Sequence, residues 1–483
     1  MPNFPASFLL NRDYGQLAVS ILFIYVAYRL FSYRCQLPPG PKPLPVIGNA
    51  HQMPTLCPEE TYQGWQKEYG DIVHVRIFGS NMLILNAFQP AHELLEKRSA
   101  LYSDRPRFVL FNELMGWYNA STHVQYGPRF RKHRRFIHQT FNEQAARSLR
   151  PIQEREALTL IRGLMESPEQ YSQHIRRFEL SAERAGSLTV QSGTPASTLV
   201  DFFPIIKYLP EWAPMAEFQR NARVVKQAVD DMMNVPFETV RDQMKAGTVS
   251  SCLTSRLLEL FGESITFQDE EDIKGTTCVL LSFILAMVLH PHVFEETQKE
   301  MDQVIGVGKL PTLEDRRRLP YLECVLKEVY RWNPPVPLGL PHRLMQDDIY
   351  NGYYIPKGAT ILANIYAMLQ GCSDPKTFRP GRYSEPESVL DCLDPQEVVF
   401  GFGRRRCPGR YFADTGIWLV VANLIASTNI AKAQDEQRRE ITPEVEFKTG
   451  FVRHPQSFPC SITPRSDEMR NLIDKYCDSD GSA

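Results

Sequence analysis

The chain lacks the features that mark a nucleic-acid-binding, zinc-binding or disulfide-stapled protein. Its formal net charge is only −2, so a general affinity for nucleic acid is not expected. Its ten cysteines include no Cys-x-x-Cys pair, which leaves no zinc or disulfide framework and suits a reducing compartment. After residue 50, no Gly/Ser-rich linker, repeat or low-complexity block divides the 483 residues. We therefore expect one large domain from 51 to 483.

Long apolar runs are also scarce, and the main candidate lies near the N-terminus. The run Leu17–Tyr28 is apolar and continues briefly after Arg29. Spanning a bilayer takes roughly 20 apolar residues, so this segment spans only if Arg29 snorkels toward the interface. A cleaved signal peptide is the alternative, although no small-residue cleavage site follows. We expect residues 1–35 to form a membrane anchor and the proline-rich residues 36–50 to form a stiff hinge.

One cysteine stands in a setting that suits a thiolate metal ligand. Cys407 lies in the run Phe400–Gly409, and three arginines directly precede it. Gly403 and Gly409 permit tight turns, and an apolar helical stretch begins at Tyr411. Backbone N–H groups, a helix N-terminus and nearby cations keep a thiolate ionised, and haem iron can take such a thiolate as its protein ligand. A buried structural cysteine in a basic loop is the alternative.

A second constellation joins one glutamate with two arginines. Glu328 and Arg331 are spaced i, i+3 and therefore share one helical face. Arg382 lies downstream in the run Phe378–Tyr383. A buried carboxylate between two guanidiniums can be fully hydrogen-bonded, whereas a solvated pair on a helix surface would contribute little.

Taken together, these motifs resemble those of the cytochrome P450 family. The pattern Phe-x-x-Gly-x-Arg-x-Cys-x-Gly is similar to the family's haem-binding loop, and Glu-x-x-Arg with the later arginine is similar to its structural triad. The resemblance implies a mainly α fold with small β-sheets and haem b, whose iron takes Cys407 as axial ligand. The loop residues that it implies around the haem are Phe400, Gly403, Arg405 and Gly409.

The same resemblance supplies partners for the haem propionates. His342 precedes Arg343 in a predicted strand pair, and of these two we expect His342 to meet a propionate. In the basic run 126–135, Arg134 matches the arginine of the family's Trp-x-x-x-Arg, although Phe130 replaces the tryptophan. Lys132 and Arg135 of the same run could instead face an acidic redox partner.

The predicted elements agree with an α-rich fold. Asp71–Ile77 alternates like a strand, and Met82–Leu85 reads as its partner across a turn. Pro90–Arg98 is typical of a short helix. Later segments have helical periodicity: Glu143–Met165, Met215–Met244, Glu295–Val304 and Leu319–Trp332.

The helix expected to cross the distal face of the haem departs from the family pattern. Family members carry Gly-x-Asp/Glu-Thr there, and the acid–alcohol pair relays protons. Here Gly275 is followed by Thr276 and Thr277 with no acid directly before them, so these threonines are the remaining catalytic candidates. From Glu271 to His290 the helix spans about 30 Å, shorter than the family's by several turns.

Two further segments look abbreviated, one between Phe178 and Ser192 and one before Asp374. Three explanations are open: wrongly joined exons, a degenerate copy that binds haem poorly, or a haem-thiolate enzyme that does not activate dioxygen.

The resemblance implies a monooxygenase that inserts one oxygen atom from O2 into an apolar small molecule. Electrons would come from NADPH through the NADPH–cytochrome P450 reductase. Within the family, the sequence resembles fungal secondary-metabolism members that are similar to the O-methylsterigmatocystin oxidoreductase group. The alternative function is a catalytically impaired haem-binding protein or a haem-thiolate enzyme that is not a monooxygenase.

The location follows from the anchor and from the microsomal members that the hinge resembles. Arg29, Arg34 and Lys42 on the C-terminal side of the apolar run place that side in the cytosol. We therefore expect a single-pass protein of the endoplasmic reticulum membrane with its catalytic domain in the cytosol. The apolar segment Leu199–Trp212 is either a lid that dips into the membrane or a buried loop between helices.

Overall fold

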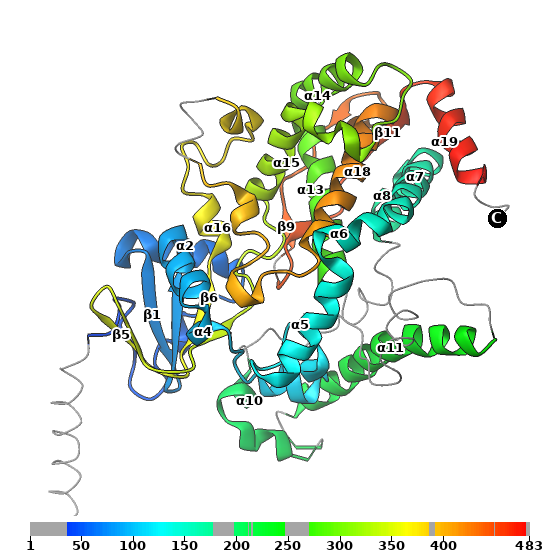
Figure 1. Ribbon diagram of the computed structural model, residues 1–483. Helices are drawn as coiled ribbons and strands as arrows, with labels where there is room; N and C mark the ends of the chain where they lie inside the picture. The colour runs from blue at the N-terminus through cyan, green and yellow to red at the C-terminus, as the bar shows by residue number, and fades with distance from the viewer. Residues whose placement is uncertain are drawn as a thin grey trace, which may run out of the picture.

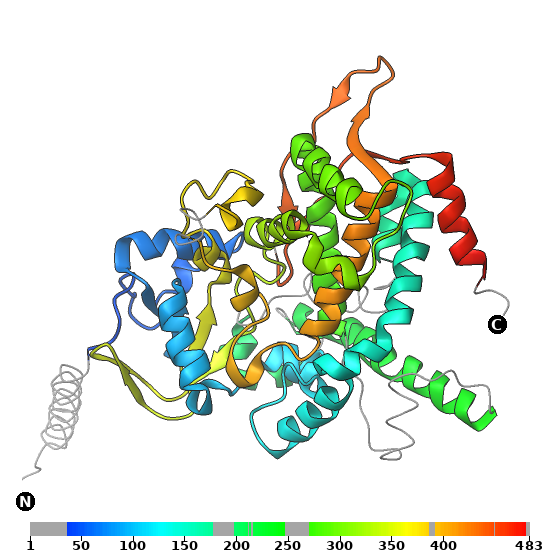
Figure 2. The same ribbon diagram turned by 45° about the horizontal axis from the view of Figure 1, so that its top comes forward.

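The computed structural model describes residues 36–176, 198–210, 212–213, 216–246, 270–385, 392–448 and 450–479 (Figures 1 and 2). Helices dominate this part of the chain and the sheets are small, which confirms the mainly α fold. The longer helices are α2 (Pro58–Tyr69), α5 (Pro128–Phe141), α7 (Arg150–Glu166), α11 (Glu217–Ala246), α13 (Glu270–Leu289), α14 (Pro291–Val304), α15 (Pro320–Trp332), α18 (Arg410–Ser427) and α19 (Asp467–Ser479). The shorter ones include α3 (Phe88–Ala91), α4 (Ser99–Tyr102), α6 (Glu143–Ala146), α8 (Tyr171–Arg176), α10 (Leu199–Phe202) and α16 (Ile365–Leu369).

The largest described sheet has four strands in the order β1 (Ile72–Ile77), β2 (Ser80–Leu85), β6 (Thr360–Ala363) and β3 (His342–Arg343). Strands β1 and β2 form the expected hairpin, with Ile77 opposite Ser80. Phe78 and Gly79 both have positive φ, as a tight two-residue hairpin turn requires. The smaller sheets pair β4 (Asp348–Tyr350) with β5 (Tyr353–Ile355), β9 (Phe447–Lys448) with β10 (His454–Pro455), and β7 (Thr428–Gln434) with β8 (Glu440–Ile441) and β11 (Cys460–Pro464).

The core lies in the helical half, on the opposite side of the molecule from the four-stranded sheet (Figure 1). Helices α13 and α18 pack against each other there, and α7, α14 and α15 surround them. Every residue of 277–288 in α13 and of 417–427 in α18 is buried. A helix that is apolar around its whole circumference is stable only when other elements enclose it, and this explains the central position of the two helices.

The distal helix is short, as the sequence predicts. Helix α13 contains 20 residues and ends at Leu289, where His290 and Pro291 begin α14. Proline at the first helical position has no N–H to satisfy and starts the new helix.

Two helix predictions needed correction at their boundaries. The predicted helix Glu143–Met165 is divided into α6, a short 3₁₀ turn and α7, because Pro151 opens α7. The predicted short helix near Pro90 is a single turn, α3, followed by the π-helical η2 (His92–Lys97).

The predicted anchor 1–35 and the shortened stretch Phe178–Ser192 lie outside the described residues. In the part of the chain that is described, no single helix has the length and apolar character needed to cross a bilayer. The proline-rich segment 36–50 lies along β1, where Pro39 O accepts a hydrogen bond from His74 N, and Gly48 pairs with Ile77.

Candidate functional site

The Cys407 loop is closed by its own backbone and docked on η2. Cys407 N donates to Phe400 O at 2.8 Å, which draws the two ends of the motif together. Gly403 has φ +52°, and a Cβ there would collide with the carbonyl oxygen of Leu95. Its N–H donates to Glu96 Oε2 at 2.5 Å. Glycine is therefore required for both the turn and the close approach.

Cys407 lies directly before the N-terminus of α18. The helix begins at Arg410, and Gly409 is its N-cap without a side-chain cap. The partial positive charge of a helix N-terminus favours a thiolate. The ring of Tyr330 on α15 lies 6.2 Å from that of Phe400, and its buried hydroxyl has no hydrogen-bond partner among the described residues. Burial raises the pKa of this phenol, so Tyr330 stays neutral beside the loop.

Arg405 is buried in the same loop and is surrounded by main-chain oxygens. Its guanidinium donates to Ser103 O at 2.7 Å, Val124 O at 2.7 Å and Ser121 O at 3.2 Å. Phe130, which replaces the family's tryptophan, lies under this guanidinium with its ring centre 3.7 Å away. These contacts orient the charge but do not neutralise it.

A second buried arginine, Arg105, lies beside the first. It donates to Thr122 O at 2.8 Å, Leu340 O at 2.9 Å and Pro341 O at 2.7 Å. It therefore fastens the chain that follows α4 to the segment leading into β3. Sequence reasoning missed this residue, because an arginine in an irregular loop has no periodicity or motif to mark it. The only feature of the sequence that could have drawn attention to Arg105 is its position between Asp104 and Pro106.

The predicted cations converge on this place. His342 is buried, and its Nδ1 lies 2.7 Å from Tyr102 O. Burial lowers the pKa of His342 well below its usual value, and the charges of Arg105 and Arg405 lower it further. Burial lowers the pKa of Arg405 to about 8, and the charge of Arg105 adds to this shift. Asp104 opposes the shift, while Arg134 on α5 contributes to it. Arg105 and Arg134 are therefore close enough to Arg405 to repel it, whereas the lowered pKa of His342 leaves its imidazole uncharged at neutral pH.

This donor set fits the carboxylates of a haem. Several cations gathered in a buried place are costly unless an anion joins them, and two propionates would supply that anion. Arg343, the less favoured of the two predicted residues, instead faces Asp104 at 3.6 Å and is half-buried. The buried guanidiniums of Arg105 and Arg405 thus fit the group that the sequence predicts, and the choice of His342 over Arg343 as a propionate partner stays a prediction.

The predicted triad forms one buried network. Glu328 accepts from Arg331 Nε and Nη2 at 2.8 Å each, and from Arg382 Nε at 3.1 Å. Arg379 N adds a fourth donor at 2.8 Å. The side chains of Glu328 and Arg382 are fully buried and that of Arg331 is nearly so. One carboxylate thus ties α15 to the chain that leads to the Cys407 loop.

The distal threonines are less clearly equipped for chemistry. Thr277 is buried, and its Oγ1 donates to Ile175 O of α8 at 3.5 Å. Thr276 is half-buried. From Thr276 to Leu289 the helix contains no aspartate or glutamate. The hydroxyl of Thr277 is therefore directed at main chain, and no neighbouring acid of this helix segment can pair with it.

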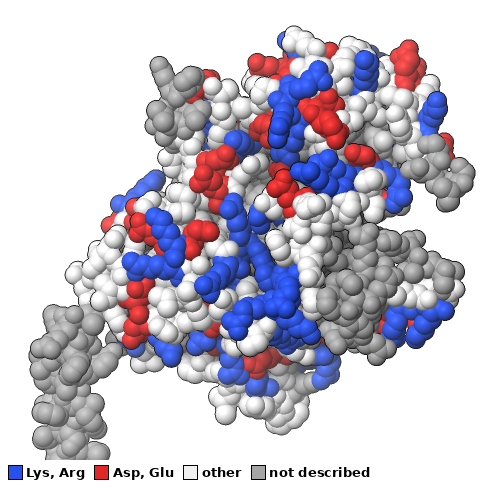
Figure 3. All heavy atoms as spheres, in the orientation of Figure 1, with Lys and Arg blue, Asp and Glu red and all other residues white. Residues whose placement is uncertain are grey.

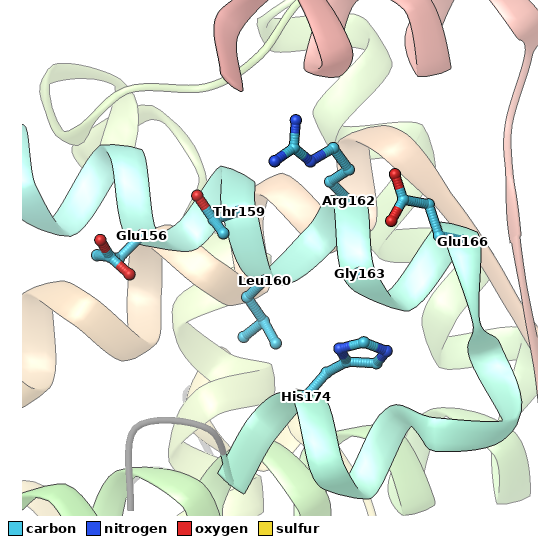
Figure 4. A pocket seen from close by; sticks show the side chains of 7 residues that line it. All are labelled: Glu156, Thr159, Leu160, Arg162, Gly163, Glu166 and His174. Atoms are coloured by element: carbon cyan, nitrogen blue, oxygen red, sulfur yellow. The ribbon is translucent and has the colours of Figure 1, made fainter. Parts of the chain in front are cut away.

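A separate cavity lies between α7 and α8 (Figure 4). Its volume is about 230 Å³, and Leu160 and His174 point into it from the two helices. His174 Nε2 lies 2.8 Å from Ser167 Oγ. None of its lining residues belongs to the predicted haem site.

Comparison with known proteins points to one family. The family model described as Cytochrome P450 matches residues 38–183 and 187–460. Cytochrome P450 monooxygenase 176 of Postia placenta is 37% identical to this chain, and the alignment covers 97% of this chain and 98% of the relative. Cytochrome P450 monooxygenase claR of Ampulloclitocybe clavipes is 38% identical to this chain, and the alignment covers 95% of this chain and 92% of the relative. Tryptamine 4-monooxygenase of Psilocybe cyanescens is 35% identical to this chain, and the alignment covers 93% of this chain and 97% of the relative.

The alignment with the first of these relatives extends over 510 residues, more than the 483 of this chain. The relative therefore has residues in the aligned region that this chain lacks.

Proposed function

Because this chain belongs to the cytochrome P450 family of haem-thiolate monooxygenases, we propose that it inserts one oxygen atom from O2 into an apolar small-molecule substrate of fungal secondary metabolism. A bound haem supplies the oxygen chemistry, and the protein supplies the ligand, the pocket and proton delivery. In this proposal the Cys407 sulfur would bind the haem iron. Arg105, Arg134, Arg405 and His342 hold the propionates.

The observation that carries the proposal is the convergence of buried cations beside the Cys407 loop. The guanidiniums of Arg105 and Arg405 are held by main-chain oxygens, so both are in position before an anion arrives. Such preorganisation lowers the cost of binding a charged group. The triad of Glu328 beneath the loop stabilises the same arrangement.

Electrons would come from NADPH through a membrane-bound reductase. Arg131, Lys132 and Arg135 of α5 are exposed, and the exposed Arg404 of the Cys407 loop contacts Tyr126 just before this helix. Lysine and arginine side chains gather across the middle of the face in Figure 3. A basic surface next to the haem ligand favours the approach of an acidic redox partner.

The site would lie at the endoplasmic reticulum membrane, with the catalytic domain in the cytosol. Large apolar side chains are exposed along η8 (Pro204–Tyr208) and just after it: Ile205 is 77% exposed and Trp212 is 84% exposed. Val46 of the proline-rich segment is 88% exposed. The ring of Phe78 lies 5.3 Å from those of Phe202 and Phe203, which joins the hairpin turn after β1 to α10 and η8. This apolar surface favours the lid interpretation of Leu199–Trp212.

The distal helix favours a second candidate function, a haem-thiolate protein with impaired or different oxygen chemistry. Thr277 donates to Ile175 O, and no acid follows within α13. Such a protein would bind carbon monoxide normally but would not turn over with NADPH. Sequencing the transcript across residues 265–285 tests the third possibility, that the short helix results from misjoined exons.

The first experiment is a carbon-monoxide difference spectrum of the full chain expressed in membranes. We expect the strongly red-shifted Soret band of a thiolate complex, and we expect Cys407→Ser to abolish it. Cys460→Ser is the matched control, because Cys460 is a half-buried cysteine in β11. A red-shifted band that survives Cys407→Ser would refute the assignment.

Turnover separates the two candidate functions. NADPH oxidation and product formation with added reductase would support the monooxygenase. A normal carbon-monoxide band without any NADPH-dependent turnover would favour the impaired haem protein.

A further inference from the structure

Two cysteines that are 20 positions apart in the sequence meet at one guanidinium. Cys372 follows α16, and Cys392 precedes the 3₁₀ turn Pro395–Glu397. Arg382 Nη1 lies 3.7 Å from the sulfur of Cys372 and 4.0 Å from that of Cys392. The two thiols are near enough for Cys372 to contribute to the raised pKa of Cys392. No short spacing motif marks this pair in the sequence.

The guanidinium between them is rigidly placed. Arg382 is fully buried and bound to Glu328, and it also donates to Ser373 O at 3.0 Å and Thr377 O at 2.9 Å. Both cysteines are half-buried, so a small oxidant can reach them. Both sulfurs lie within 4.0 Å of Arg382 Nη1, so the two thiols are neighbours. A disulfide then requires side-chain rotation that brings the two sulfurs to about 2.05 Å from each other.

We propose that Cys372 and Cys392 are a modification site, at which a hydroperoxide such as hydrogen peroxide forms a reversible intrachain disulfide. This inference does not depend on haem binding or on the monooxygenase activity. It adds a redox-sensitive cross-link to the segment that supports the Cys407 loop.

The reaction balances with one equivalent of peroxide. One thiol loses its proton, and the thiolate attacks an oxygen of hydrogen peroxide. The O–O bond breaks, a sulfenic acid forms, and the hydroxide that leaves takes up the released proton to give one water. The second thiol then attacks the sulfenic sulfur and expels a second water as the S–S bond forms. The two sulfurs are oxidised by two electrons in total and the peroxide oxygens are reduced. A dithiol reductant reverses the step.

The surroundings make the bond slow to form but compatible with the fold. Burial and the neighbouring Cys372 raise the pKa of Cys392, while Arg382 opposes this shift. Little thiolate is therefore present at neutral pH, so oxidation needs sustained peroxide and is faster at higher pH. A disulfide is as neutral as the two thiols, so Arg382 keeps its bonds to Glu328 and the carbonyl oxygens.

The cross-link would restrain the chain between residues 372 and 392, which carries Arg382. Closing a loop of this length reduces the freedom of the unfolded chain and stabilises the folded one. We therefore expect the oxidised protein to melt several degrees higher than the reduced protein.

The test uses the full-length protein incubated with hydrogen peroxide, then alkylated and digested with trypsin without reduction. Cys372 lies in the tryptic peptide 358–376 and Cys392 in 383–404, so a disulfide joins two separate peptides. We expect mass spectrometry to find this pair, and dithiothreitol to release it. Recovery of both peptides alkylated, or of a sulfinic acid on one cysteine without the linked pair, would overturn the proposal.

The thermal shift supplies a second readout. Cys372→Ser should abolish the difference in melting temperature between peroxide-treated and reduced protein. Cys477→Ser, which alters a half-buried cysteine of α19, should preserve that difference. If Cys372→Ser fails to fold, peptide mapping of the unmodified sequence still decides the question.

Discussion

Single residues decide how charge is buried beneath the Cys407 loop. Glu328 balances two buried guanidiniums, and every one of its oxygens accepts a hydrogen bond. Replacing one partner in such a network leaves the others charged and desolvated. We expect Glu328→Gln to lower the free energy of unfolding by about 3–5 kcal/mol, measured by chemical denaturation.

The matched control for this change is an exposed ion pair. Asp230 lies 2.8 Å from Lys226 on α11, and both side chains are more than two-fifths exposed. Asp230→Asn should change the free energy of unfolding by less than about 0.5 kcal/mol. Equal losses in the two variants would show that the triad does not depend on buried charge.

Histidine burial predicts a loss of stability in mild acid. His74 of β1 is half-buried with Nε2 3.0 Å from Asn81 Oδ1, and desolvation lowers its pKa below the usual value. Below about pH 6.5 the unfolded chain therefore binds a proton that the folded chain resists, so this stability is present above that pH and is lost as the pH falls.

We expect His74→Gln to reduce the fall in unfolding free energy between pH 7.5 and 5.5 by up to about 1.4 kcal/mol per pH unit. Urea unfolding at both pH values measures this change. His138→Gln, at an exposed histidine of α5, should leave the slope as it is. An unchanged slope in His74→Gln would contradict the assigned direction.

At the scale of elements, the contact between the Cys407 loop and η2 depends on one glycine. Any side chain at Gly403 would both strain a left-handed backbone and meet the Leu95 carbonyl. We expect Gly403→Ala to cost more than about 2 kcal/mol, because the strain of a left-handed alanine alone costs about 1–2 kcal/mol. The intensity of the carbon-monoxide difference band should be several-fold lower in Gly403→Ala than in the unchanged protein.

Gly352, in the turn between β4 and β5, is the control position that distinguishes backbone strain from a steric clash. Its φ is +80°, but no atom lies within 4 Å of a Cβ placed there. Gly352→Ala should therefore show the strain of about 1–2 kcal/mol and an unchanged band. If both alanine variants behaved alike, the contact with η2 would not matter for the site.

At the scale of the whole molecule, charge is unevenly placed although the net charge is only −2. The exposed basic residues of α5 lie on the same surface as Arg404. We expect the double change Lys132→Glu and Arg135→Glu to slow electron transfer from the reductase by about tenfold at low salt, with the difference shrinking as salt screens it. Stopped-flow reduction of the carbon-monoxide complex measures the rate.

Lys245→Glu, at an exposed residue at the end of α11, changes the net charge by half as much as the double variant and controls for charge that is introduced outside α5. Reduction by dithionite should be equal in all three proteins, because it needs no docking. A double variant that is reduced as quickly as the control by the reductase would remove α5 from the docking surface.

Local sequence patterns predicted which helices and strands form more accurately than they predicted the residues at which these elements begin and end. Alternating apolar residues gave the correct hairpin of β1 and β2, and apolar periodicity located α14, α15 and α18. The break at Pro151 was overlooked because the apolar period continues through it, although proline has no N–H for an interior turn. The π-helical η2 has the same composition as an α-helix, so only packing distinguishes it.

The Cys407 loop, the triad and the short helix α13 could be predicted from the sequence, because each depends on residue types at fixed local spacings. The number of residues available to α13 can be counted in the sequence, so its length of 20 residues needs no tertiary information. In contrast, the gathering of Arg105 with Arg405 and His342, and of Cys372 with Cys392, was decided only by the tertiary structure. These groups come from loops without periodicity, and long-range packing of the surrounding helices and strands brings them together.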